Sequence, residues 1–263
     1  MKGLSASLAP LNLPDWQYHA EAGSTNDLAL AWAEQGAVDG SLVLADSQTA
    51  GRGRADRRWV TQPGAALALS LVLRPSTAEV EYVPRFTALA ALGLVETLAQ
   101  RGLAAEIKWP NDVLVRGRKV AGVLVEAFWQ GEKLDALIVG MGVNVTPGAL
   151  PPAEELRFPA TSIEAELGES VDRWVILAGI LQSIFTYRTI LITDAFMAAW
   201  NEKLAYKAEW ITFRFANGQE KPARVLAVLP DGRLALQVEG QSEPILAAAG
   251  EVELAGYGGR LSA

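Results

Sequence analysis

Residues 50–59 read Ala-Gly-Arg-Gly-Arg-Ala-Asp-Arg-Arg-Trp and follow residues 42–45, an apolar run that predicts a buried strand. Glycine lets the backbone approach a ligand closely, and arginine offers a fixed fork of donors that matches carboxylate and phosphate oxygens. The segment therefore predicts a loop that binds an anion, with a solvated charged face as the alternative. Because Asp56 stands where a third glycine would be, and no G-K-[ST] follows, the two common phosphate-loop patterns do not apply.

A second segment, residues 108–112, reads Lys-Trp-Pro-Asn-Asp and closes a short apolar run. Residues 119–122 read Lys-Val-Ala-Gly and follow a turn at residues 116–117. The simplest interpretation is a hairpin with a Pro-Asn turn at its entrance. That interpretation does not explain why a lysine and a tryptophan end a strand so close to the turn.

In combination, these segments resemble the catalytic domain of biotin protein ligases. That family carries G-R-G-R-x-G-R-x-W, K-W-P-N-D, K-x-A-G and G-x-N in this order, and the matching segments here are residues 51–59, 108–112, 119–122 and 142–144. Two further segments also fit, Ser-Thr-Asn at 24–26 and Ala-Thr-Ser at 160–162. The resemblance covers nearly the whole chain, and its one departure is Asp56 in place of a glycine.

The resemblance implies an α+β fold. A mixed β-sheet with packed helices, similar to class II aminoacyl-tRNA synthetases, would form the biotin- and ATP-binding domain at residues 1–204. A small C-terminal β-barrel of the Src-homology-3 type would follow at residues 205–263, where several short strands are punctuated by Asn-Gly, Asp-Gly and Glu-Gly.

The residue patterns themselves predict individual elements. Strands are expected at residues 16–21, 41–49, 66–73, 106–109, 113–115, 119–128 and 134–145, and in the barrel at 210–215, 224–229, 233–238 and 244–248. Helices are expected at residues 24–35, 84–101, 161–167 and 172–204, the last with a break at 189–193. Residues 1–15, 147–159 and 256–263 are expected to be irregular.

The composition excludes several classes of protein. The 263 residues are 50% hydrophobic, which suffices for a large core, and the formal net charge of −7 argues against general nucleic-acid binding. The chain has no cysteine, which excludes disulfides, zinc-thiolate sites and a cysteine nucleophile. Its single histidine, His19, is interpreted as an ordinary strand residue.

The N-terminal residues 1–13 do not form a signal-peptide pattern, and no uncharged apolar run reaches the length of a bilayer. A cytoplasmic protein without membrane contact is therefore expected. No helix-turn-helix pattern precedes the first motif, so we expect the form of the family that lacks an N-terminal DNA-binding domain.

The resemblance also implies a reaction. Biotin's carboxylate would attack the α-phosphate of ATP, giving biotinyl-adenylate and pyrophosphate, and a lysine of a biotin carboxyl carrier domain would then take the biotin. ATP normally arrives with Mg²⁺. No permanently bound cofactor is implied, and monomer and homodimer both stay open.

Site residues follow from the matching motifs. The implied catalytic residues are Lys108, Arg54, Asp112 and Lys119. The implied biotin-binding residues are Ser24, Thr25, Asn26, Gln48, Gly51, Arg52, Gly53, Arg54, Lys108 and Gly122. The implied ATP-binding residues are Arg54, Arg57, Trp59, Asn111, Lys119 and Asn144, with Asn111 also as a magnesium ligand.

Some of these residues have simpler interpretations. Ser24 could only cap a helix, with Asp27 three residues on. Trp59 could belong to the core. Asn111 and Asp112 could form a turn that merely positions Lys108. Among the cations, Lys108 is the first choice for bridging the biotin carboxylate and the α-phosphate, because a cation there lowers the barrier to joining two anions.

Two other functions remain open. A lipoate or octanoate ligase on the same fold would use a comparable adenylation step, although K-W-P-N-D with the arginine–glycine loop favours biotin. A non-catalytic biotin-binding relative is the other alternative, and Asp56 alone supports it, because its carboxylate could pair with a loop arginine and weaken the grip on the anion.

Overall fold

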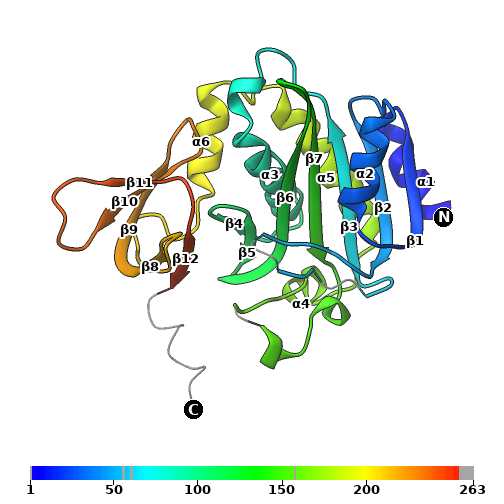
Figure 1. The fold of residues 1–263 in the computed structure, drawn as a ribbon. Coiled ribbons are helices and arrows are strands. Elements are labelled where there is room, and N and C mark those ends of the chain that lie inside the picture. The colour runs from blue at the N-terminus through cyan, green and yellow to red at the C-terminus, as the bar shows by residue number, and fades with distance from the viewer. Residues whose placement is uncertain (1, 55–56, 60–61, 157, 255–263) are drawn as a thin grey trace.

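The computed structural model describes residues 2–54, 57–59, 62–156 and 158–254 (Figure 1). The larger of its two β-sheets has the strand order β1-β2-β3-β7-β6-β5-β4. Its strands are β1 (Trp16–Ala22), β2 (Ser41–Gln48), β3 (Ala66–Leu73), β4 (Ala105–Lys108), β5 (Asp112–Val115), β6 (Arg118–Gln130) and β7 (Lys133–Asn144). Because β1 and β2 are parallel and the other neighbours antiparallel, the sheet is mixed, as predicted.

The smaller sheet is antiparallel and has the order β11-β10-β9-β8-β12. Its strands are β8 (Trp210–Arg214), β9 (Glu220–Val228), β10 (Leu234–Val238), β11 (Ile245–Ala247) and β12 (Glu251–Leu254). This arrangement is consistent with the expected Src-homology-3-like domain, and the domain boundary after residue 204 stays a prediction. Strand β12 was not anticipated from the sequence.

Six α-helices lie in the described part of the chain: α1 (Lys2–Leu8), α2 (Thr25–Glu34), α3 (Arg85–Ala99), α4 (Ile163–Leu167), α5 (Arg173–Arg188) and α6 (Asp194–Glu202). Short 3₁₀ turns occupy Ala9–Leu11, Val80–Tyr82, Pro147–Ala149 and Ala153–Glu155. The predicted break in the last long helix is confirmed between α5 and α6. None of the helices described is long and apolar enough to cross a membrane.

The expectation of an irregular N-terminus is wrong for residues 2–8, which form α1. Leu4 and Leu8 lie one helical turn apart and are both buried, at 1% and 3% exposure. They join the main core beside α5, against which α1 packs (Figure 1). Burial of this apolar pair therefore stabilises a segment whose own sequence carries only a weak helical signal.

Helices cover both faces of the larger sheet (Figure 1). Helix α2 covers one face, where its Ala29 and Ala33 pack with Val72 of β3 and Ile138 of β7. Helices α3 and α5 cover the opposite face and contribute to the main core. All eight residues of β3 are buried, because this strand has a covering layer on each side.

The alternation of side chains along β7 decides where a ligand site can form. Residues 137, 139, 141 and 143 belong to the main core beneath α3 and α5. With a period of two, Gly140, Gly142 and Asn144 must face the α2 side. Near the start of α2, Gly140 and Gly142 therefore form a stretch of this face without side chains, which we call the glycine floor.

Candidate active site

A cavity of about 970 Å³ opens over this glycine floor. It is lined by every residue that the sequence assigned to a site except one: Ser24, Thr25, Asn26, Gln48, Arg52, Gly53, Arg54, Arg57, Trp59, Lys108, Asn111, Asp112, Lys119, Gly122 and Asn144. The exception, Gly51, lines a smaller adjoining cavity of about 470 Å³ that shares Gln48 and Trp59. Motifs separated by more than a hundred residues thus meet in one place.

At two positions of the floor, any side chain larger than that of glycine would displace a neighbouring side chain. A Cβ built on Gly140 would lie 2.1 Å from Asn26 Oδ1, and one on Gly142 would lie 2.2 Å from Trp59 Cε2. Neither residue has a positive φ, so close approach rather than backbone conformation is the reason for glycine here. Gly140 was missed at the level of sequence, because nothing local marks the approach of a side chain from α2.

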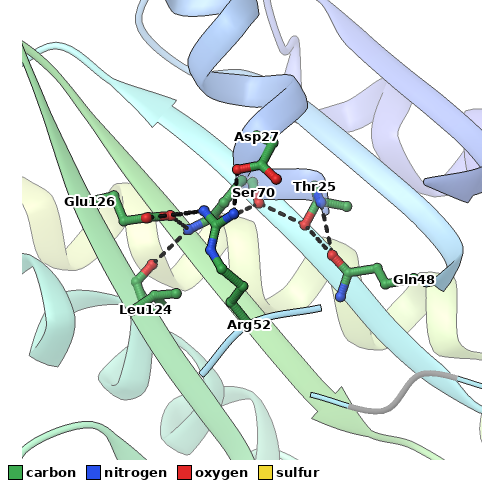
Figure 2. A network of polar contacts seen from close by, with 8 residues as sticks. Thr25, Asp27, Gln48, Arg52, Ser70, Leu124 and Glu126 are labelled. Atoms are coloured by element: carbon green, nitrogen blue, oxygen red, sulfur yellow. Dashed lines mark hydrogen bonds and ion pairs between the residues drawn. The ribbon is translucent and has the colours of Figure 1, made fainter. Parts of the chain in front are cut away.

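The polar end of the cavity lies at the start of α2 (Figure 2). Gln48 Oε1, at the end of β2, accepts hydrogen bonds from Thr25 N at 2.8 Å and Thr25 Oγ1 at 3.1 Å. Ser70 Oγ of β3, fully buried, lies 2.8 Å from Thr25 Oγ1 and 2.6 Å from Asn26 Oδ1. Ser70 was not anticipated from the sequence. It does not line the cavity but contacts two residues that do.

Ser24 occupies the N-cap position of α2, but its hydroxyl makes no capping hydrogen bond. The simple capping role is therefore wrong for this side chain. Because Ser24 is 3% exposed and lines the cavity, its hydroxyl stands among the groups that could contact a ligand.

The cationic centre lies where β4, β5 and β6 meet. Asp112 Oδ1 forms an ion pair with Lys119 Nζ at 2.6 Å, and Asp112 Oδ2 lies 3.7 Å from Lys108 Nζ. The Lys108 ammonium also lies 3.9 Å from the centre of the Phe158 ring. Burial lowers the pKa of Lys108, and the neighbouring Lys119 lowers it further, whereas Asp112 raises it. A single carboxylate thus positions two ammonium groups.

Residues 51–53 and 57–59 of the arginine–glycine segment pair as the two antiparallel arms of a narrow hairpin, and residues 55–56 lie outside the described structure. Gly53 N donates to Arg57 O at 2.6 Å, and Trp59 N donates to Gly51 O at 2.9 Å. Asp56, the departure from the family motif, is among the residues not described.

Three of the four arginines in this hairpin already have partners: Arg52 with Asp27 and Glu126, Arg57 with Glu251, and Arg58 with the Thr49 carbonyl. The Arg54 guanidinium has no hydrogen bond or ion pair with any residue that the structure describes, and only the Arg54 carbonyl is engaged, by Arg57 N at 3.3 Å. Burial lowers the pKa of Arg54, and the nearby Asp112 raises it. Among the loop arginines, Arg54 is therefore the one left available for an anion.

Trp59, Asn144 and Asn111 occupy the remaining wall. The Trp59 ring lies 5.6 Å from Lys119 Nζ, and its Nε1 is buried without a hydrogen-bond partner in the described part of the chain. Asn144 Nδ2 donates to the Thr161 carbonyl at 3.1 Å, and Asn111 Nδ2 donates to the Val123 carbonyl at 2.8 Å. Trp59 lines the cavity rather than only the core.

A buried glutamate that sequence reasoning missed supports this wall. The side chain of Glu166 in α4 is 0% exposed and accepts from Thr161 Oγ1 at 2.6 Å and from Arg118 at 2.6 Å. Thr161 N in turn donates to the Lys119 carbonyl at 2.8 Å. Glu166 thus fixes the segment that holds both Asn144 and the backbone of Lys119.

The C-terminal sheet closes the cavity from the far side, through Arg214, Phe215, Gly250, Glu251 and Glu253. Trp109, next to Lys108, donates from Nε1 to the Gly232 carbonyl at 3.0 Å and so docks the β9–β10 turn. These C-terminal residues were not anticipated as part of the site, because β12 was not predicted and no motif marks it.

The charge of the cavity differs from that of the chain. Seven cationic side chains and four carboxylates line it, in a protein whose net charge is −7. Cations held around a partly apolar cavity suit the joining of two anions, because they are already in place when charge develops. No cluster of three metal-binding side chains occurs among the described residues.

Comparison with known proteins agrees with this geometry. Residues 21–144 match the model of the Biotin/lipoate A/B protein ligase family. The bifunctional ligase/repressor BirA of Bacillus subtilis is 39% identical over 170 residues, which are 64% of this chain and 50% of that protein. The chain therefore spans about half the length of this relative.

Two further matches extend over most of both chains. The biotin–[acetyl-CoA-carboxylase] ligase of Mycobacterium tuberculosis is 32% identical over 250 residues, covering 89% of this chain and 86% of that protein. The structure of the Aquifex aeolicus biotin protein ligase in complex with biotin and ATP superposes with a TM-score of 0.76 at 26% identity, covering 91% of this chain and 97% of that one.

Proposed function

The chain belongs to the biotin protein ligase family, and from this premise we propose that it activates biotin with ATP and transfers it to a protein lysine. In the first step a biotin carboxylate oxygen attacks the α-phosphorus, the bond to the β-phosphate oxygen breaks, and pyrophosphate leaves. In the second step a lysine amine of a biotin carboxyl carrier domain attacks the mixed anhydride, AMP leaves, and the amine loses a proton.

The observation that carries this proposal is the convergence of Lys108, Lys119 and Arg54 at one end of a cavity whose other end presents the neutral side chains of Thr25, Asn26 and Gln48. Thr25, Asn26 and Gln48 offer neutral donors and acceptors for biotin's ureido group. Lys108 would bridge the carboxylate and the α-phosphate. A free Arg54 and the ammonium of Lys119 would neutralise phosphate charge.

The remaining residues take supporting roles in this proposal. Asp112 orients Lys108 and Lys119 and would accept the proton of the incoming lysine. Arg57, Trp59 and Asn144 would border the nucleotide. Gly51, Gly53 and Gly122 would let the backbone approach biotin, and Arg52 and Ser24 would line the same end.

Magnesium would enter as the ion carried by ATP. Asn111 donates its amide to a backbone carbonyl, which leaves Oδ1 as its metal-binding atom. Phosphate oxygens of ATP and water would supply most of the ion's other ligands, as is usual for Mg²⁺ at nucleotide sites. A cytoplasmic location and the choice between monomer and homodimer stay predictions.

The product formed from ATP, Mg²⁺ and biotin tests the proposal. Mass spectrometry of the mixture is expected to show biotinyl-5′-AMP, and addition of a carrier domain is expected to consume it. Lipoate or octanoate supplied in place of biotin should give little adenylate. A preference for lipoate would support the lipoate-ligase alternative, and biotin binding without any adenylate would support the non-catalytic one.

An ordinary lysine has a pKa of about 10.4. We expect the rate of adenylate formation to decline at a lower pH than this. Burial lowers the pKa of Lys108, so its ammonium is complete at low pH and is lost as the pH rises through that lowered pKa. Pyrophosphate release at saturating biotin and ATP, measured between pH 7 and 10, reports this loss. A rate that stays constant over the whole range would contradict the assignment of a protonated Lys108 to the reaction.

A further inference from the structure

Arg52 does not point its guanidinium at the cationic centre. It lies instead between the start of α2 and the middle of β6, where two carboxylates hold it (Figure 2). Its Nη2 lies 3.0 Å and 2.9 Å from the two carboxylate oxygens of Glu126, and its Nη1 pairs with Asp27 Oδ1. The hydrogen bond to Asp27 raises the pKa of Arg52, and that to Glu126 raises it further.

Glu126 has a second partner among the residues that line the cavity. Its Oε2 accepts a hydrogen bond from Asn26 Nδ2 at 2.5 Å, while the same amide nitrogen lies 3.4 Å from the Leu124 carbonyl. One carboxylate is therefore shared by the arginine of the loop and an amide that lines the ligand cavity. Glu126 links the position of the loop to the position of Asn26.

The backbone at Arg52 transmits this anchoring to the other arm of the hairpin. Arg52 forms a β-bridge with Arg58, and the flanking hydrogen bonds join Gly53 to Arg57 and Trp59 to Gly51. Holding Arg52 therefore also holds Trp59, which covers Gly142 on the cavity floor.

The charge balance argues against a direct anion-binding role for Arg52. Two carboxylates already surround its single positive charge, whereas Arg54 has no such partner in the described structure. A phosphate or carboxylate approaching Arg52 would meet the repulsion of Asp27 and Glu126.

We propose that Asp27 and Glu126 form a clasp that holds Arg52, and through it the arginine–glycine hairpin, over the cavity. Glu126 and Asp27 are then positioning residues, and Arg52 acts as a tether rather than as a ligand for the anion. Where the ligand is biotin, which rests on the proposed function, opening the clasp releases it.

The size of the effect follows from the exposure of the three side chains. The side chains of Arg52, Asp27 and Glu126 are 41%, 55% and 37% exposed. Each exposed ion pair therefore shifts the equilibrium between the held and the released hairpin by a factor of up to about five. Breaking one pair should therefore loosen the hairpin measurably without unfolding it.

Amide hydrogen exchange on the ligand-free protein tests the clasp without any assumption about function. In Glu126→Gln and in Asp27→Asn, exchange at Gly53 N and Trp59 N is expected to be measurably faster than in the wild type, by up to about fivefold. Glu132→Gln removes the same charge from an exposed position in the β6–β7 turn and serves as the matched control, with exchange unchanged.

Asp27→Asn tests the clasp alone. It weakens the ion pair with Arg52 but leaves the hydrogen bond between Glu126 and Asn26 in place. In an Arg52→Gln background, neither acidic substitution should accelerate exchange further, since the tether is already lost. Wild-type exchange in both single variants, or full additivity with Arg52→Gln, would overturn the proposal.

The rate of biotin dissociation supplies the functional arm. Glu126→Gln and Asp27→Asn are each expected to raise it by up to about fivefold, while adenylation at saturating biotin and ATP changes by less than about twofold. If the wild type binds no biotin, the proposed function is wrong, but the hydrogen-exchange measurement still tests whether Asp27 and Glu126 hold the hairpin. If biotin binds and dissociates from both variants at the wild-type rate, the clasp has no part in retaining it.

Discussion

Lys108→Ala is expected to slow formation of biotinyl-adenylate by about a hundred- to a thousandfold, the cost of losing one preorganised group that stabilises developing charge. Lys108 is the last residue of strand β4, and its ammonium lies between Asp112 and the Phe158 ring. It is therefore in place before the two anions meet. Its interaction strengthens as negative charge gathers on the α-phosphate. Pyrophosphate release under single-turnover conditions measures the step.

The fold of this variant should survive. Lys108 is buried at 8% exposure, and burial disfavours its charge, so its removal costs little stability. Asp112 keeps its closer partner, Lys119, at 2.6 Å. Circular dichroism controls for folding, and Lys133→Ala, at an exposed position, is the matched control. A folded Lys108→Ala variant that makes adenylate at nearly the wild-type rate would transfer the role to Lys119 or Arg54.

Gly140→Ala is expected to weaken biotin binding by about ten- to a hundredfold. The new methyl group would lie 2.1 Å from Asn26 Oδ1 and 2.8 Å from its Cγ, so Asn26 must move. Moving it breaks its hydrogen bonds to Glu126 and Leu124 and its contact with Ser70, and leaves buried polar groups unsatisfied. Isothermal titration with biotin measures the loss.

Gly23→Ala is the matched control for this substitution. Gly23 adjoins the same helix start, its φ is not positive, and a Cβ there would meet no atom within 4 Å. Its biotin affinity is expected to equal that of the wild type. Wild-type affinity in a folded Gly140→Ala protein would mean that Asn26 does not contribute to the biotin site.

Much of this protein could be predicted from local patterns in its sequence. The alternation and burial of apolar residues identified the strands of the mixed sheet, and β-branched residues at 189–193 marked the break between α5 and α6. The resemblance to the ligase motifs named residues that the folded chain brings together around one cavity, while their individual roles stay predictions. Such features depend on neighbours along the chain, which the sequence displays directly.

The tertiary structure decided what each of those residues does. The four loop arginines look equivalent in sequence. The folded chain engages Arg52 and Arg57 with carboxylates from distant segments and Arg58 with the nearby Thr49 carbonyl, whereas the Arg54 guanidinium has no partner among the described residues. Glycine at position 140 leaves room for the side chain of Asn26 from α2, more than a hundred residues away. Strand β12 and helix α1 are stabilised by packing against elements far along the chain, rather than by their own weak propensities. Burial and charge pairing are set by neighbours in space, and only the folded chain brings those neighbours together.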